Sequence, residues 1–225
     1  MAEIYNTDRF AELYYPSNTA DLLQLGLAAR YVALLFESYQ ITYAFIGGWA
    51  VYLRGGRRST QDIDIAVASP MNVLKQILTA QPRIHFPAVH GRTSIQIFID
   101  TGRTFDEEFP HVPDLAVSNL GTPEDLHSSR EPINPYRPTP LASPVLVLGL
   151  VFQIHAKLDA FARRGEQESK DFVDLEFLFT QYATQIPEFR ECFSSEQRRH
   201  FWLHYTGKYV GFPDQVDNMR ILLGL

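Results

Sequence analysis

Two aspartates two residues apart, Asp62 and Asp64, have the clearest capacity for chemistry in this sequence. They flank Ile63, and Ile65 and Val67 continue an apolar alternation that predicts a β-strand. Because residues i and i+2 of a strand point to the same face, both carboxylates would leave one face. Carboxylates held this close repel each other unless a cation lies between them. The pattern therefore predicts a site for a hard divalent cation, Mg²⁺ or Mn²⁺, which takes oxygen ligands.

A pair of glycines, Gly47 and Gly48, lies upstream of the aspartates. Residues 41–46 predict a short buried strand and residues 49–53 the start of a helix, so the glycines form a strand-to-helix turn. Glycines let backbone N–H groups approach a ligand closely, and a helix N-terminus adds partial positive charge that suits phosphate. A phosphate cradle followed by a metal-binding carboxylate pair is the equipment for phosphoryl or nucleotidyl transfer.

Each of these features also has a purely structural interpretation. The aspartates are compatible with a solvated edge strand, and the glycine pair with a turn that needs positive φ. Arg58 fits a solvated loop as well as a phosphate or carboxylate partner, and Thr60 fits a hydrogen bond within the turn. The order and spacing of the features favour a site over isolated structural roles.

The same residues resemble a known superfamily. Ile46-Gly47-Gly48, followed by Arg58-x-Thr60-x-Asp62-x-Asp64, is similar to the signature of the DNA polymerase beta-type nucleotidyltransferases. The form of the second motif resembles small members related to abortive-infection (AbiEii-like) toxins and to aminoglycoside nucleotidyltransferases. The resemblance implies an α/β (α+β) nucleotidyltransferase fold. It also implies Mg²⁺-dependent transfer of NMP from an NTP such as ATP to a hydroxyl acceptor, with release of pyrophosphate.

The resemblance implies a role for each matching residue. The glycine pair would hold the β,γ-phosphates, the aspartate pair would bind the metal and act in catalysis, and Arg58 and Thr60 would support nucleotide binding. In the second half, 157–164 resembles a helical K-x-x-A-x-x-x-R motif, in which Lys157 faces the triphosphate. Lys170, Asp171 and Asp174 match a later K-D-x-x-D motif, and the two acids are equally compatible with ion pairs on a helix face.

The superfamily uses a third carboxylate on a neighbouring strand, where it binds the metal or acts as base for the acceptor. Asp100, at the end of the strand predicted for 93–100, is the candidate. Alignment on Thr101-Gly102 instead puts Phe98 at the acidic position. Either Asp100 serves through a local shift or the site lacks this acid. In the second case the protein is a catalytically weakened nucleotide-binding module that acts through a protein partner.

Apolar periodicity predicts the elements that position these residues. Expected helices are 19–39, 49–53, 71–80, 144–164, 166–180 and 196–209, and expected strands are 41–46, 62–68, 83–89, 93–100 and 115–120. This order suits a small mixed sheet with helices on one side, followed by a helical subdomain. Six prolines between residues 121 and 144 predict a linker or surface loop. We therefore expect an α/β domain at 1–130 and a helical subdomain at 131–225, with the site in the cleft between them.

Whole-chain properties limit the partners. The net charge of −6 argues against broad, non-specific nucleic-acid binding, which relies on summed basic charge. A small hydroxyl-bearing acceptor suits this charge, and a tRNA end suits the toxin-like resemblance. One cysteine excludes an intramolecular disulfide, and no signal peptide or membrane span is visible, so we expect a cytoplasmic protein. The sequence leaves a protein partner open.

Overall fold

A computed structural model describes residues 1–101, 115–119, 123–141, 144–164 and 169–225. The chain divides into two compact units. Unit 1 comprises Met1–Gly55 and Ser59–Leu148, and unit 2 comprises Gly56–Arg58 and Gly149–Leu225. Each unit is described by itself.

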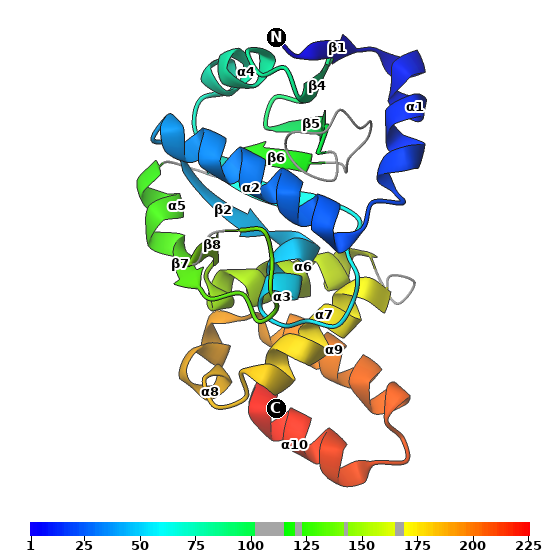
Figure 1. Cartoon of the computed structure of the whole chain (residues 1–225). Helices are drawn as coiled ribbons and strands as arrows, with labels where there is room; N and C mark the ends of the chain where they lie inside the picture. Colours follow the sequence, from blue (N-terminus) through cyan, green and yellow to red (C-terminus); the bar gives the residue numbers. More distant parts are fainter. Residues whose placement is uncertain (102–114, 120–122, 142–143, 165–168) are drawn as a thin grey trace. The chain divides into compact units, whose positions relative to one another are not determined.

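Unit 1 is built on a mixed sheet with the strand order β1-β4-β5-β6-β3-β2-β8-β7 (Figure 1). Its elements are β1 (Glu3–Tyr5), α1 (Thr7–Ser17), α2 (Leu22–Ser38), β2 (Thr42–Ile46), α3 (Gly47–Leu53), β3 (Ile63–Ala68), α4 (Met71–Thr79), β4 (Ile84–Pro87), β5 (Ser94–Ile99), β6 (Leu115–Asn119), α5 (Pro123–Ser129), β7 (Arg130–Ile133) and β8 (Val145–Leu148). The central strand β3 pairs antiparallel with β2 and parallel with β6. Both motifs of the predicted site therefore lie on adjacent strands.

The main core of unit 1 lies between α2, α4 and one face of the sheet. The isoleucines at 63 and 65 and Val67 are fully buried there with apolar residues of both helices. α2 begins at Leu22, later than the expected start at residue 19, because Asp21 is its N-cap and forms a capping box with Gln24. This corrects the predicted start of the first long helix.

The opposite face of the sheet is also covered, so the expectation of helices on one side is wrong. Leu126 of α5 packs on Ala44 and Ala66, and α1, which the periodicity did not predict, places Phe10 against Phe98. Small alanines on this face leave room for the packed helix. Alanine is a weak apolar signal in the sequence, which hid the second layer.

The proline-rich segment contributes to the sheet instead of forming only a linker. β7 pairs antiparallel with β8, and β8 joins β2. Pro132 lies on β7, the edge strand, where a missing backbone N–H is tolerated. Because these strands belong to unit 1, the division between the units falls after Leu148, beyond the predicted segment.

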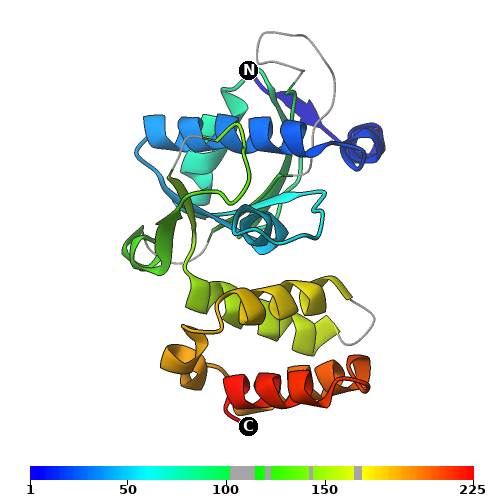
Figure 2. The same cartoon turned by 60° about the horizontal axis from the view of Figure 1, so that its bottom comes forward.

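Unit 2 is helical, as the periodicity predicts. It contains α6 (Leu150–Arg164), α7 (Ser169–Gln181), α8 (Ile186–Phe189), the 3-10 turn η1 (Arg190–Cys192), α9 (Ser195–Lys208) and α10 (Pro213–Leu223). Figure 2 shows α6 beside α7 in one layer and α9 beside α10 in the next. The predicted helix 144–164 starts late, because the alternating residues Val145–Leu148 form β8. The predicted start of the next helix, at 166, lies outside the described residues.

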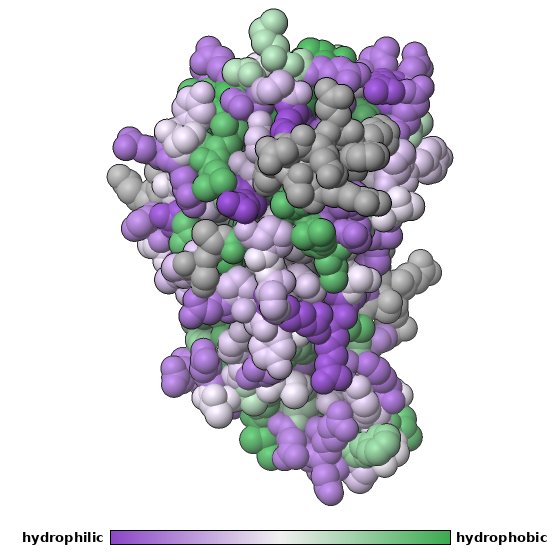
Figure 3. Space-filling model, in the orientation of Figure 1, coloured by the Kyte–Doolittle hydropathy of each residue, from purple (hydrophilic) through white to green (hydrophobic). Residues whose placement is uncertain are grey.

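The helices in the part of the chain that the structure describes differ from membrane-spanning helices in length and hydropathy. None of the helices there is both long and apolar enough to cross a bilayer. On the face drawn in Figure 3, hydrophobic and hydrophilic residues are interspersed.

Replacing Leu126 by Ala tests the second layer of unit 1. Leu126 is 3% exposed, so the Leu126→Ala variant should lose about 2–4 kcal/mol of unfolding free energy through lost burial and a residual cavity. Urea denaturation followed by circular dichroism measures the loss. Leu34→Ala is the control, because Leu34 is 49% exposed and its truncation should cost little. Equal losses in both variants would contradict packing of α5 on the sheet.

Candidate functional site

The glycine turn joins β2 directly to α3. Ile46, the last residue of β2, is the N-cap of α3 and pairs across the sheet with Asp64 of β3. Gly47 is the first helical residue and has φ of +65°, a left-handed conformation that favours glycine. Gly48 follows it in the first turn of α3. The pairing of the two strands therefore sets the glycine turn beside the second aspartate of the D-x-D pattern.

Gly47 and the carboxylate of Asp64 approach each other closely. A Cβ atom added at Gly47 would lie 2.1 Å from Asp64 Oδ2, well inside any real contact distance. Only a residue without a side chain fits here. Partial positive charge in the first turn of a helix favours an adjacent carboxylate. The motif glycine and the motif aspartate therefore form one packed unit.

Asp62 is oriented by Thr60, which lies two residues before it in the chain. It immediately precedes β3 and is exposed, whereas Ile63 is fully buried and Asp64 is partly buried. The hydroxyl of Thr60, itself buried, lies 2.9 Å from Asp62 Oδ1 and 3.1 Å from the Asp62 carbonyl oxygen. The hydrogen bond predicted within the turn is therefore present, and it orients the first aspartate.

The aspartate pair suits a magnesium ion with a partial protein shell. Within the described residues no group of three His, Cys, Asp or Glu side chains is arranged to hold a metal. Mg²⁺ commonly binds through one or two carboxylates and completes its octahedron with water and substrate phosphates. The alternating exposure of Asp62, Ile63 and Asp64 fits that mode, because both acids leave the buried side of β3.

Asp100 is engaged elsewhere in the sheet. His85 Nε2 lies 3.0 Å from Asp100 Oδ1, while His85 Nδ1 lies 3.0 Å from Glu3 Oε2. Arg83 also donates to the Asp100 carbonyl oxygen. The structure therefore places Asp100 in a carboxylate–imidazole–carboxylate bridge at the end of β5 and does not group it with the D-x-D pair.

The strand register bears on the alternative position for the third acid. Ile97 of β5 pairs with Leu115 of β6, which pairs with Ile63. The next residue of β5, Phe98, is buried against α1. In the sequence, Asp114 precedes Leu115; it lies outside the described residues, and the periodicity gave no reason to select it. Asp100 and Asp114 are the two carboxylates to compare by mutation.

Unit 2 contains a buried cluster of charges around Lys157. Its Nζ lies 2.9 Å from Asp171 Oδ1 and 2.8 Å from Asp174 Oδ2. Arg58 donates to both oxygens of Asp174, at 2.9 and 2.8 Å, and Arg164 lies 3.2 Å from Asp171 Oδ2. The side chains of the two acids are at most 3% exposed. Among the described residues of the cluster, three cations, Arg58, Lys157 and Arg164, surround two carboxylates.

In this cluster the two acids of the K-D-x-x-D motif form ion pairs. Both acids point to Lys157 and the arginines, whereas Lys170 is exposed. The sequence missed the pairing of Arg58 with Asp174, since 116 residues separate them and no local pattern links them. Such a bidentate pair fixes the guanidinium plane, which a lysine at position 58 would not reproduce.

Comparisons with known proteins decide the family. The family model described as "Nucleotidyl transferase AbiEii toxin, Type IV TA system" matches residues 32–218, most of the chain. This protein belongs to the AbiEii nucleotidyltransferase family. The match includes both units and all of the motif residues discussed above.

Solved structures show the same fold in proteins similar to this AbiEii-family chain. An antigenic nucleotidyltransferase-like protein from Paracoccidioides brasiliensis has a TM-score of 0.55 at 17% identity, covering 89% of this chain and 93% of its own. JHP933 from Helicobacter pylori has a TM-score of 0.50 at 17% identity, covering 91% and 82%. The antibiotic-resistance factor ANT(2'')-Ia has a TM-score of 0.52 at 14% identity, covering 87% and 98%. No match was found among curated protein sequences.

The AbiEii-family chain should lose stability as His85 loses its proton. Burial alone lowers the pKa of His85, but the hydrogen bond to Asp100 and the charges of Asp100 and Glu3 raise it above its ordinary value of 6.5. Protonated His85 therefore stabilises the fold fully below about pH 6.5, and this contribution is lost as pH rises through the raised pKa. Urea midpoints between pH 5 and pH 9 measure the loss. His85→Gln should flatten the curve in this window, and an unchanged curve would contradict the bridge.

Replacing Gly47 by Ala should destabilise the AbiEii-family chain. The positive φ alone costs roughly 1–2 kcal/mol for a residue with a Cβ atom, and the clash with Asp64 adds to it. The free energy of unfolding from urea titration checks this. Gly207→Ala is the matched control, because no atom lies within 4 Å of its added Cβ and it sits inside α9. That change should stabilise by about 0.5–1 kcal/mol. A Gly47→Ala variant as stable as wild type would refute the close approach.

Proposed function

We propose that this protein transfers NMP from an NTP to a hydroxyl acceptor and releases pyrophosphate, with Mg²⁺ or Mn²⁺ held by Asp62 and Asp64. Membership of a nucleotidyltransferase family supports the reaction class. The observation that carries the assignment to these residues is the packing of Gly47 against the Asp64 carboxylate, with Asp62 held by Thr60. The backbone proposed to bind phosphate, at the start of α3, is thereby adjacent to the carboxylate of β3 that is proposed to bind the metal.

The proposed reaction is an in-line displacement at the α-phosphorus. The acceptor oxygen forms a bond to phosphorus while the bond to the bridging oxygen breaks, and pyrophosphate leaves with the bonding electrons. The hydroxyl proton passes to a carboxylate. A bound Mg²⁺ would neutralise phosphate charge and align the reacting groups.

Each residue of the chain then has a specific task. The backbone of Gly47 and Gly48 binds the β,γ-phosphates, because residues without side chains let a phosphate approach the main chain closely at the start of α3. Thr60 keeps the Asp62 carboxylate in one orientation through its hydroxyl. Pre-set ligand geometry of this kind avoids reorganisation when the nucleotide binds.

The Lys157 cluster has its own part in the proposal. Asp171 and Asp174 hold Lys157 and Arg58 in place. Lys157 is proposed to bind the triphosphate, with Arg58 as supporting charge, as the family resemblance implies, and the cations outnumber the carboxylates among the described residues of the cluster. Lys170, which is exposed, has no positioning partner of this kind in the cluster.

The nature of the acceptor is the finer part of the proposal. A complex of ANT(2'')-Ia with adenylyl-2''-tobramycin is among the similar solved structures, and in that protein the acceptor is a small molecule. The net charge of −6 of this chain also favours a small acceptor over an extended polyanion such as tRNA.

A second candidate is a weakened nucleotide-binding module that acts through a protein partner. The pairing of Asp100 with His85 and the lack of a three-acid group among the described residues favour it. Such a protein would bind Mg²⁺–NTP without releasing pyrophosphate. A pyrophosphate assay on wild type, Asp100→Asn and Asp114→Asn separates the two candidates and identifies which acid accepts the proton.

Calorimetric titration of each of the four NTPs, with and without Mg²⁺, tests the proposed site. Wild type should bind at least one NTP only when the metal is present. Asp64→Asn should weaken that binding at least tenfold, about 1.4 kcal/mol, because it removes a charged metal ligand while keeping the shape of the side chain. Asp217→Asn, an exposed change in α10, should bind as wild type does. Metal-independent binding, or full binding by Asp64→Asn, would refute the site.

A further inference from the structure

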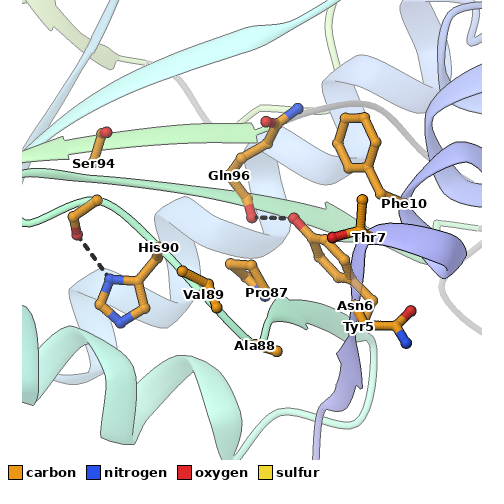
Figure 4. Close-up of a pocket in the computed structure, with 11 residues that line it drawn as sticks. Tyr5, Asn6, Thr7, Phe10, Pro87, Ala88, Val89, His90, Ser94 and Gln96 are labelled. Atoms are coloured by element: carbon orange, nitrogen blue, oxygen red, sulfur yellow. Dashed lines mark hydrogen bonds between the residues drawn. The ribbon is translucent and has the colours of Figure 1, made fainter.

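A cavity of about 420 Å³ lies in unit 1 beside the sheet (Figure 4). It is lined by the β1–α1 segment, by the β4–β5 hairpin and by the first half of β5. Its volume is within the range of roughly 300–1,000 Å³ that small-molecule sites occupy. The residues proposed above for nucleotide and metal do not line it.

The lining has an aromatic side and a polar side. In Figure 4 the rings of Tyr5 and Phe10 lie on one side, and Ser94 and His90 lie on the other. The hydroxyl of Tyr5 donates to the Gln96 carbonyl oxygen at 2.8 Å, which fixes its ring against β5. Rings present faces on which a ligand ring stacks, and hydroxyl and amide groups bind ligand hydroxyls.

The charge of the lining is as informative as its shape. None of the described residues that line the cavity is Asp, Glu, Lys or Arg. A charged ligand therefore finds no carboxylate, ammonium or guanidinium partner among these described residues. The cavity therefore suits an uncharged molecule, in contrast to an aminoglycoside cation or a nucleic-acid phosphate.

The strand register relates this cavity to the aspartate pair. Gln96 of β5 pairs with Ala116 of β6, and Ala116 pairs with Asp64 of β3. Directly paired residues project from the same face of a sheet, so Gln96 and Asp64 share one face. Two strand spacings of roughly 4.8 Å separate them, about 10 Å in all. A molecule the size of a nucleoside or disaccharide spans that distance.

The position of the cavity relative to β3 also matches the direction of attack in the proposed displacement. The strand order places β2, with Gly47 after it, on one side of β3, and β6 followed by β5 on the other. In an in-line displacement the leaving and attacking oxygens lie on opposite sides of the phosphorus. If Gly47 holds the departing phosphates, the attacking hydroxyl comes from the side of β5.

We propose that this cavity is the acceptor site and that the acceptor is an uncharged, hydroxyl-bearing small molecule with a ring, such as a nucleoside or neutral sugar. The inference rests on the proposed NMP transfer. Tyr5, which is 5% exposed, and the partly buried Phe10 form an apolar wall beside the ring, and Ser94 and Gln96 bind its polar edge. The free hydroxyl extends along the sheet face toward Asp64, where its oxygen attacks the α-phosphorus, its proton passes to a carboxylate and pyrophosphate leaves.

Transfer of radiolabelled NMP from an α-labelled NTP tests the proposal with the full-length chain and Mg²⁺. The uncharged probes are the four ribonucleosides, glucose and maltose, and the charged comparators are tobramycin and 5′-AMP. Label should move to at least one uncharged probe and to neither comparator. Ser94→Asp places a carboxylate at an exposed position of the lining and should raise the KM of that acceptor about tenfold or more.

The control is Ser195→Asp, the same change at an exposed position at the start of α9. It should leave the acceptor KM unchanged, and both variants should retain wild-type Mg²⁺–NTP affinity and melting behaviour. With Mg²⁺–NTP binding intact, transfer only to a charged comparator, transfer to no probe, or equal KM values in the two variants would overturn the acceptor site alone. Failure of wild type to bind Mg²⁺–NTP would instead refute the proposed function, and the acceptor site with it.

Discussion

The antiparallel pairing of β2 with β3 is the constraint on which the candidate site depends. It aligns Ile46 with Asp64, so the residue after Ile46 must approach a carboxylate at a distance that excludes a side chain. The positive φ of Gly47 turns the chain into α3 at the same point. Glycine is required here for two independent reasons, conformation and space. The two motifs are separate in the sequence, yet this pairing makes them one structural feature.

Burial on both faces of the sheet makes this pairing rigid. β3 is covered by α2 and α4 through its isoleucines and by α5 through its alanines, so a one-residue slip would push the large isoleucines against α5 and turn Asp64 into the main core. The register is therefore strongly specified where the carboxylates must be placed. The same register fixes the distance between the cavity at β5 and Asp64, because strand spacing sets that distance.

The charge cluster of unit 2 illustrates a different principle. Asp171 and Asp174 are almost fully buried, and removing their partners would leave uncompensated charge in a poorly hydrated site. Lys157 and Arg58 consequently have defined positions rather than the mobility of surface cations. A buried ion cluster of this kind is weak evidence for stability, but it fixes the positions of its side chains.

The sequence by itself determined those features of the fold and the site that depend only on residues close together in the chain. Strand alternation at 62–68, the glycine turn and the helical periodicity of the second half are local patterns, and they predicted the adjacent motifs, the mixed α/β unit and the helical unit correctly. The family resemblance rested on the same local motifs. The hydrogen bond from Thr60 to Asp62 spans two residues and was likewise predictable.

Only the tertiary structure decided the contacts between distant segments. The pairing of Arg58 with Asp174, the bridge from Asp100 through His85 to Glu3, and the packing of Leu126 on β3 each join residues that no periodicity relates. The strands at 130–133 and 145–148 were hidden because both are short and the first contains Pro132, which its edge position in the sheet tolerates. Local propensity acts over a few residues, while register, burial and charge pairing are set by the folded chain as a whole, and those determine which carboxylates meet.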